Sequence, residues 1–143
     1  DPDEYFQRNL YMGAFTMVPY PGDDHSILPG DVNEHFYLDY GPLFIAMRAR
    51  TWVLRAGVIK AGEGAAKANL FETPDHYVAF VGLGGHQKTA EIELRGINGE
   101  AKVLYPGETS ETRLTPREEA GVAIFDVPLK RGCAMLLFEK KTA

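Results

Sequence analysis

The strongest constraint in this sequence is the pattern of short apolar runs that follows Thr51. The runs are rich in β-branched and aromatic residues, and Gly, Asn and Pro interrupt them about every 8–12 residues. In the clearest run Ile92 and Leu94 alternate with charged neighbours, which places one set of side chains inside and the other toward water. The runs lie at 52–54, 58–59, 67–71, 77–81, 91–94, 102–105, 122–127 and 134–139. They predict a mainly β fold, an antiparallel β-sandwich of about eight strands with one face of each strand exposed.

The residues between the runs are typical of hairpin turns. Thr73-Pro74-Asp75 joins two runs, Asn98-Gly99 is a strong two-residue turn signal, and Lys130-Arg131-Gly132 precedes the last run. We therefore expect local, antiparallel connections.

The first 50 residues differ from the rest, because they combine aromatics and prolines with helical spacing. We expect one helix over about residues 2–13 and a second from about 40 to 50, with Pro42 in its first turn. The stretch between them, residues 14–31, holds three prolines and two glycines and is expected to be an ordered or ligand-binding loop. The predicted division is a helical and loop segment at 1–50, followed by the sandwich at 51–143.

Composition limits the classes of function. The chain has 143 residues, a net charge of −5 and mixed charges without a basic stripe, so nucleic acid is not an expected partner. No apolar run approaches the ~20 residues that cross a bilayer, so no membrane partner is predicted. The single cysteine, Cys133, is expected to be a buried apolar filler. The histidine spacing fits no zinc motif, and neither a metal nor another cofactor is predicted.

The most suggestive polar cluster is Asp23, Asp24 and His25, in a loop that begins with Pro21-Gly22. These side chains could fix turns, contact a ligand such as a sugar, or act as acid and base. A glycosidase needs two carboxyl groups that face each other about 5–10 Å apart. Adjacent aspartates seldom provide that geometry, so no catalytic residue is assigned and no complete active site is expected in this chain.

Aromatic side chains offer a second candidate site. Tyr20 and Trp52 could stack on sugar rings if they are exposed, whereas residues of this type more often bury area between a helix and a sheet. We expect Trp52 to be mainly a core residue, because it opens a strand directly after a helix.

Several segments of the chain resemble bacterial glycoside-hydrolase-like proteins. The segments at 10–15, 21–27, 38–44 and 50–54 (LYMGAF, PGDDHSI, LDYGPLF and RTWVL) look like the end of the barrel region of such proteins. The segments at 69–71 and 133–136 (NLF and CAML) are similar to their C-terminal β-sandwich. The resemblance implies that the catalytic acid and nucleophile lie upstream, in a barrel that is this chain's partner, and that the loop with Asp23 contacts carbohydrate.

Three functions follow as hypotheses. The first is a non-catalytic accessory domain that stabilises a catalytic barrel; the second is an autonomous carbohydrate-binding module; the third is an independent enzyme that uses Asp23, Asp24 and His25. A periplasmic or secreted location stays open, because no targeting signal is readable in these residues.

Overall fold

The fold is mainly β, as predicted from the alternating runs. The computed structural model describes residues 1–14, 34–97 and 99–140. In these ranges ten strands form two antiparallel sheets, and two helices precede them, α1 (Pro2–Tyr11) and α2 (Glu34–Ala46). The six-stranded sheet has the order β1–β3–β4–β10–β6–β7, and the four-stranded sheet has the order β2–β5–β9–β8. The predicted sandwich with N-terminal helices is confirmed, with ten strands rather than about eight.

The strand bounds in the six-stranded sheet are β1 (Thr51–Trp52), β3 (Lys67–Glu72), β4 (His76–Gly82), β6 (Ala101–Leu104), β7 (Thr112–Leu114) and β10 (Ala134–Glu139). Those in the four-stranded sheet are β2 (Ile59–Ala61), β5 (Thr89–Arg95), β8 (Arg117–Glu119) and β9 (Val122–Pro128).

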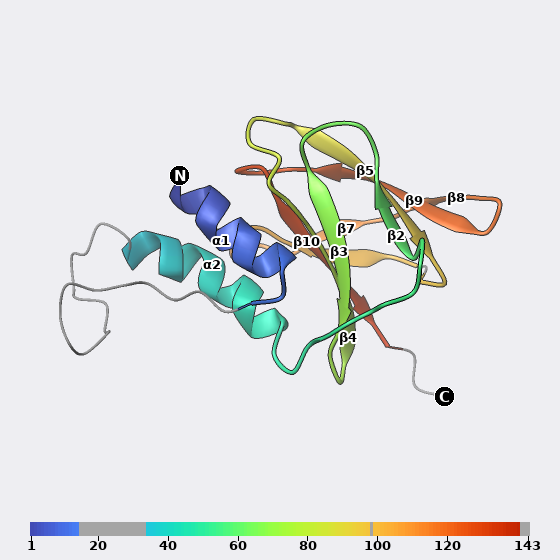
Figure 1. The fold of residues 1–143 in the computed structure, drawn as a ribbon, viewed down its shortest axis with the longest axis horizontal. Helices are drawn as coiled ribbons and strands as arrows, with labels where there is room; N and C mark the ends of the chain where they lie inside the picture. The colour runs from blue at the N-terminus through green and yellow to red at the C-terminus, as the bar shows by residue number, and fades with distance from the viewer. Residues whose placement is uncertain (15–33, 98, 141–143) are drawn as a thin grey trace.

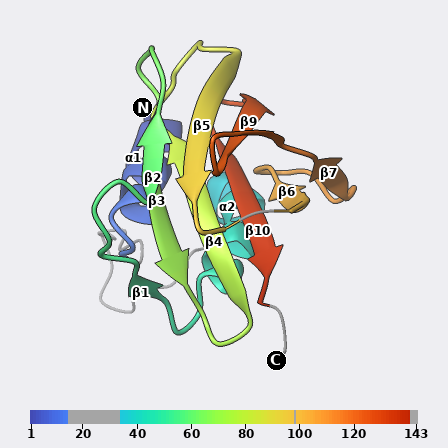
Figure 2. The same ribbon diagram turned by 90° about the vertical axis from the view of Figure 1, so that its right-hand side faces the viewer.

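The molecule has three layers. Both helices lie against one face of the six-stranded sheet, and the four-stranded sheet covers its other face (Figures 1 and 2). The interior between the two sheets holds side chains that include Leu70, Ala79, Val81, Ile92, Leu94, Phe125, Leu136 and Phe138. The predicted alternation of β5 is confirmed, since Ile92 and Leu94 are fully buried while Glu91 and Arg95 are exposed.

A second apolar layer lies between the helices and the six-stranded sheet. The helices and the residue after α2 contribute Phe6, Leu10, Tyr40, Leu43 and Met47. The sheet and the residue before β10 contribute Phe71, Val78, Phe80, Cys133, Met135 and Leu137. Strands β4 and β10 are therefore buried on both faces. The expectation that one face of every strand meets water is wrong for these two strands, because the helices cover that face.

The helices form for local reasons that were partly visible in the sequence. The Asp1 carboxylate caps α1 by accepting a hydrogen bond from the Asp3 N–H at 2.9 Å, and Pro2 occupies the first turn, where it costs no intrahelical bond. Helix α1 ends two residues before the predicted boundary. Helix α2 begins earlier than predicted, so Pro42 lies inside it. Pro42 offers no N–H to the carbonyl of Leu38, but both residues are exposed and water can serve that carbonyl.

The three predicted turns have different outcomes. Thr73-Pro74-Asp75 joins β3 to β4, and the Thr73 N–H donates to the His76 carbonyl at 2.8 Å. Lys130 and Cys133 form a bridge around Arg131 and Gly132, whose φ angles of 55° and 83° fit a two-residue hairpin turn. The hairpin predicted at Asn98-Gly99 is wrong, because the strands on either side belong to different sheets. Asn98 itself lies outside the described residues.

Charged residues cover the outward face of the four-stranded sheet. Glu91 and Asp126 are direct neighbours across β5 and β9, and like charges in that position repel. Arg117 on β8 bridges them, with its Nη1 at 2.5 Å from Asp126 and its Nη2 at 3.1 Å from Glu91. This face is thus solvated and held by its own ion pairs.

Candidate functional site

Helix α2 is apolar on two opposite sides. Tyr40, Leu43 and Met47 are buried against the six-stranded sheet. Leu38, Pro42 and Ile45 follow at i, i+4 and i+7 on the outward side, and Leu38 is 70% and Ile45 58% exposed. We call these three residues the outer stripe. A helix that is apolar on both sides is typical of a buried element, so the outer stripe is a candidate interface with another protein surface.

The side chain of Gln7 joins both helices to the sandwich. Its Nε2 donates to the Tyr40 hydroxyl oxygen at 3.0 Å and to the Arg131 carbonyl at 2.6 Å, and its Oε1 accepts from the Leu83 N–H at 2.8 Å. Gln7 is only 2% exposed, so these partners replace water. One buried amide therefore fixes α1, α2 and two loops of the sandwich relative to one another.

An ion-pair network lies at the edge of this amide cluster. The Arg131 guanidinium contacts the Asp3 Oδ1 through Nε at 2.9 Å and Nη2 at 2.8 Å, and it donates to the Asp39 Oδ2 through Nη1 at 2.7 Å. The Tyr40 hydroxyl donates to the same Asp3 oxygen at 2.7 Å. Burial raises the pKa of Tyr40, which keeps the hydroxyl protonated as a donor. The outer stripe is thus presented on a helix that is held rigidly in place.

Trp52 is the one sequence-predicted site residue that the structure describes. It lies on β1, at the edge of the six-stranded sheet, and 44% of its surface is exposed. Its ring packs edge-to-face on Phe71, with centroids 5.5 Å apart, and its Nε1 lies close to Gly13. The expectation of a core residue is wrong, because β1 is only two residues long and nothing among the described residues covers its outer side. The other candidates, Tyr20, Asp23, Asp24 and His25, lie outside the described residues.

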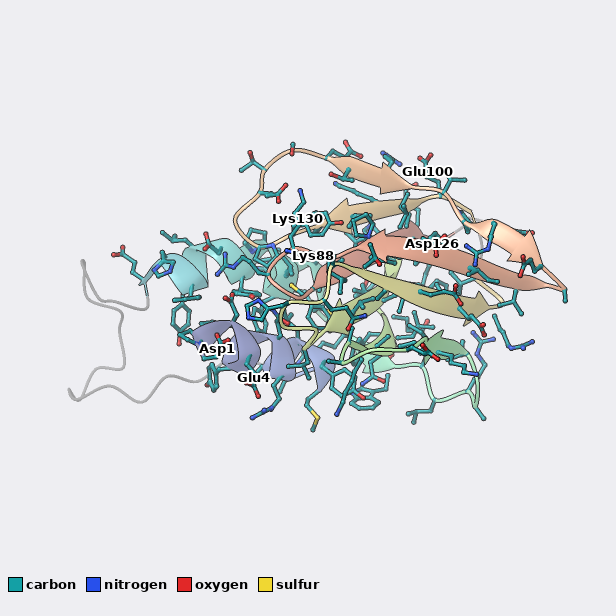
Figure 3. All side chains as sticks on the ribbon, turned by 90° about the horizontal axis from the view of Figure 1, so that it is seen from above. Asp1, Glu4, Lys88, Glu100, Asp126 and Lys130 are labelled. Atoms are coloured by element: carbon teal, nitrogen blue, oxygen red, sulfur yellow. The ribbon has the colours of Figure 1, made fainter. Side chains whose placement is uncertain are left out.

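A polar cleft of about 540 Å³ lies beside the start of α1. Its acidic side chains already have partners. Asp1 caps the helix, Asp3 binds Arg131, and Glu4 pairs with Arg8; Figure 3 shows Asp1 and Glu4 on this first turn. The described residues therefore offer no pair of opposed, unengaged carboxyl groups in this cleft. Among the same residues no group of three or more His, Cys, Asp or Glu gathers around a common point that could hold a metal.

Sequence reasoning missed the residues that build these sites. Gln7 and Arg131 are 124 positions apart, and no local pattern links them. The outer stripe had a visible signal, since Leu38 and Ile45 lie opposite the predicted buried side of α2 on a helical projection. Neither described helix is long and apolar enough to span a bilayer.

No protein-family model, curated protein or solved structure matches the chain. The resemblance to glycoside hydrolases accordingly stays a prediction from the sequence.

Proposed function

We propose that this chain is a non-catalytic β-sandwich accessory domain of a glycoside hydrolase, which stabilises an upstream catalytic barrel. The observation that carries the proposal is the outer stripe of α2, with Leu38 and Ile45 exposed on a helix whose other side is fixed to the sandwich. Burying an exposed Leu or Ile side chain fully contributes about 1.5–3 kcal/mol. A second domain that covers the outer stripe would therefore increase the stability of this chain and of that domain.

The engagement of the acids in the cleft also supports an accessory role. A retaining or inverting glycosidase needs two carboxyl groups free to act on the bond between them. Asp3 and Glu4 are held in ion pairs, so this cleft lacks such a pair among the described residues. The proposal assigns the chemistry to the barrel, in agreement with the sequence resemblance.

The test uses the complete gene product and a double variant, Leu38→Glu with Ile45→Glu. We expect faster thermal inactivation of its glycosidase activity with an unchanged initial rate, because the interface is lost while the distant active site stays intact. The matched control is Leu54→Glu, which changes another apolar residue that is 84% exposed and lies outside both helices in the sequence. The isolated chain with the same double substitution should melt at the wild-type temperature.

Two outcomes would overturn the proposal. One is a gene product in which no catalytic domain precedes these residues. The other is a double variant that inactivates no faster than Leu54→Glu.

Exposure of Trp52 favours a second candidate, an autonomous carbohydrate-binding module. A half-exposed indole on an edge strand can stack on a sugar ring and bury apolar area. Titration of the isolated chain with a panel of oligosaccharides tests this candidate, with Trp52→Ala and Tyr20→Ala as variants. Saturable binding that Trp52→Ala abolishes would support it, and no binding across the panel would remove it.

A further inference from the structure

Residues from the α1 side and from the sandwich line the polar cleft beside α1. The α1 side contributes the carboxylates of Asp1, Asp3 and Glu4 together with Arg8. The sandwich contributes Lys67 at the start of β3, His86 in the loop after β4, and Arg131. Hydrogen-bond acceptors and donors therefore line the same cleft of about 540 Å³, a volume in the usual range for small-ligand sites.

Hydrogen bonds hold the backbone of the residues that line the cleft. Leu83 and Arg131 both line the cleft and both have left-handed backbones, with φ angles of 63° and 55°. Non-glycine residues adopt this region at a cost and need surrounding structure to hold them. The Gln7 amide supplies it for both, and the Gly84 N–H donates to the Gly132 carbonyl at 3.0 Å. The backbone around the cleft is therefore already in place before a ligand binds, so binding costs little conformational entropy.

The charges of the cleft are not equally engaged. The three acids have partners, as do Arg8 and Arg131. Lys67 and His86 have no ion-pair or hydrogen-bond partner among the side chains that the structure describes, and the backbone N–H groups of Gly85 and His86 have no acceptor there. The groups without partners on the sandwich side of the cleft are therefore hydrogen-bond donors, and one of them, Lys67, is a cation.

We propose that this cleft binds a saccharide that carries a carboxylate. The carboxylate lies against Lys67 and His86, where charge-assisted hydrogen bonds form. The sugar hydroxyls donate to the carboxylate oxygens of Asp1 and Glu4, which retain free lone pairs. The choice of a saccharide rests on the carbohydrate role proposed above, whereas the carboxylate subsite follows from the side chains of the cleft.

The test is an NMR titration of the chain with glucuronate, glucose and acetate at equal ionic strength, following the backbone amide signals. We expect glucuronate to shift the signals of Lys67, Gly85 and His86 in a saturable way. Lys67→Gln and His86→Gln should each weaken this binding about tenfold or more, the loss of one charge-assisted hydrogen bond. The control Lys60→Gln, on β2, should bind as the wild type does.

The remaining outcomes separate the two parts of the proposal. Glucose and acetate should each bind at least about tenfold more weakly than glucuronate. Acetate as strong as glucuronate would overturn the saccharide part, and binding that both Gln variants leave unchanged would overturn the site. Failure here leaves the thermal inactivation test of the outer stripe unaffected, so the two proposals fail separately.

Discussion

The buried amide of Gln7 gives the sharpest prediction about stability. Replacing it by Met keeps a similar length and volume but removes one donor group and one acceptor. The Leu83 N–H and the Arg131 carbonyl then lose the partners that now lie at 2.8 and 2.6 Å. The Tyr40 hydroxyl keeps Asp3 as its acceptor. The side chain at position 7 is 2% exposed, so water does not readily take its place, and each backbone group that loses its partner there costs about 1–2 kcal/mol. Gln7→Met should therefore lower the free energy of unfolding by about 2–4 kcal/mol.

Urea unfolding measures this loss directly, with tryptophan fluorescence and circular dichroism as probes. Trp52 is the only tryptophan, and it lies beside Gly13 just after α1, so its fluorescence reports the docking of that helix. A domain of this size has only about 5–15 kcal/mol of stability, so the predicted loss is easily resolved.

The matched control for this measurement is Gln87→Met. Gln87 also bonds two backbone groups, accepting from the Ala66 N–H at 2.9 Å and donating to the Thr89 carbonyl at 2.9 Å. That glutamine is only partly buried, so water can replace the lost partners. Equal losses of stability in Gln7→Met and Gln87→Met would refute the reasoning, because burial would then make no difference.

Three further predictions test other parts of the fold. Burial raises the pKa of the Cys133 thiol to about 12 from its ordinary value near 9, so the folded state favours the neutral thiol. The stability that this preference provides is complete below pH 9 and is lost as the pH rises toward 12. The free energy of unfolding, measured in urea, should therefore fall less steeply for Cys133→Ala than for the wild type between these pH values. Gly132→Ala places a Cβ 2.6 Å from the Gly85 nitrogen at a φ of +83°. The control Gly121→Ala carries a similar backbone strain, at a φ of +77°, but its Cβ would meet no atom within 4 Å. Calorimetry should therefore show a much larger drop in Tm for Gly132→Ala than for Gly121→Ala. Arg117→Leu leaves the two facing carboxylates of β5 and β9 unbridged, so its Tm should fall, and less so in high salt.

The strands of the sandwich were predictable where buried apolar residues alternate with exposed polar residues in the sequence. Strand β5 is an example, since its apolar residues meet the other sheet and its charged residues meet water. Strands β7 and β8 gave no such signal. Residues 117–119 are exposed and charged, and they pair with β9 as an edge strand without contributing to the core. Backbone pairing and surface ion pairs hold β8 in place, and neither leaves an apolar pattern to read in the sequence.

The candidate sites were less predictable, because they depend on contacts between distant segments. The half-exposure of Trp52 follows from the two-residue length of β1, which sequence spacing did not reveal. Burial of β4 and β10 on both faces was readable in part, since Val78, Ala79, Phe80 and Val81 are apolar without alternation. A continuous apolar run of that kind is typical of a strand covered on both sides.

Hydroxyl-radical footprinting of Leu38 and Ile45 tests the central claim most directly, since it reports the exposure of individual side chains. In the isolated chain both residues should be oxidised readily, as their exposed fractions of 70% and 58% imply. In the complete gene product we predict strong protection of both, while Leu54 remains as reactive as before. Equal oxidation of the outer stripe in the two forms would contradict the claim that another domain covers α2.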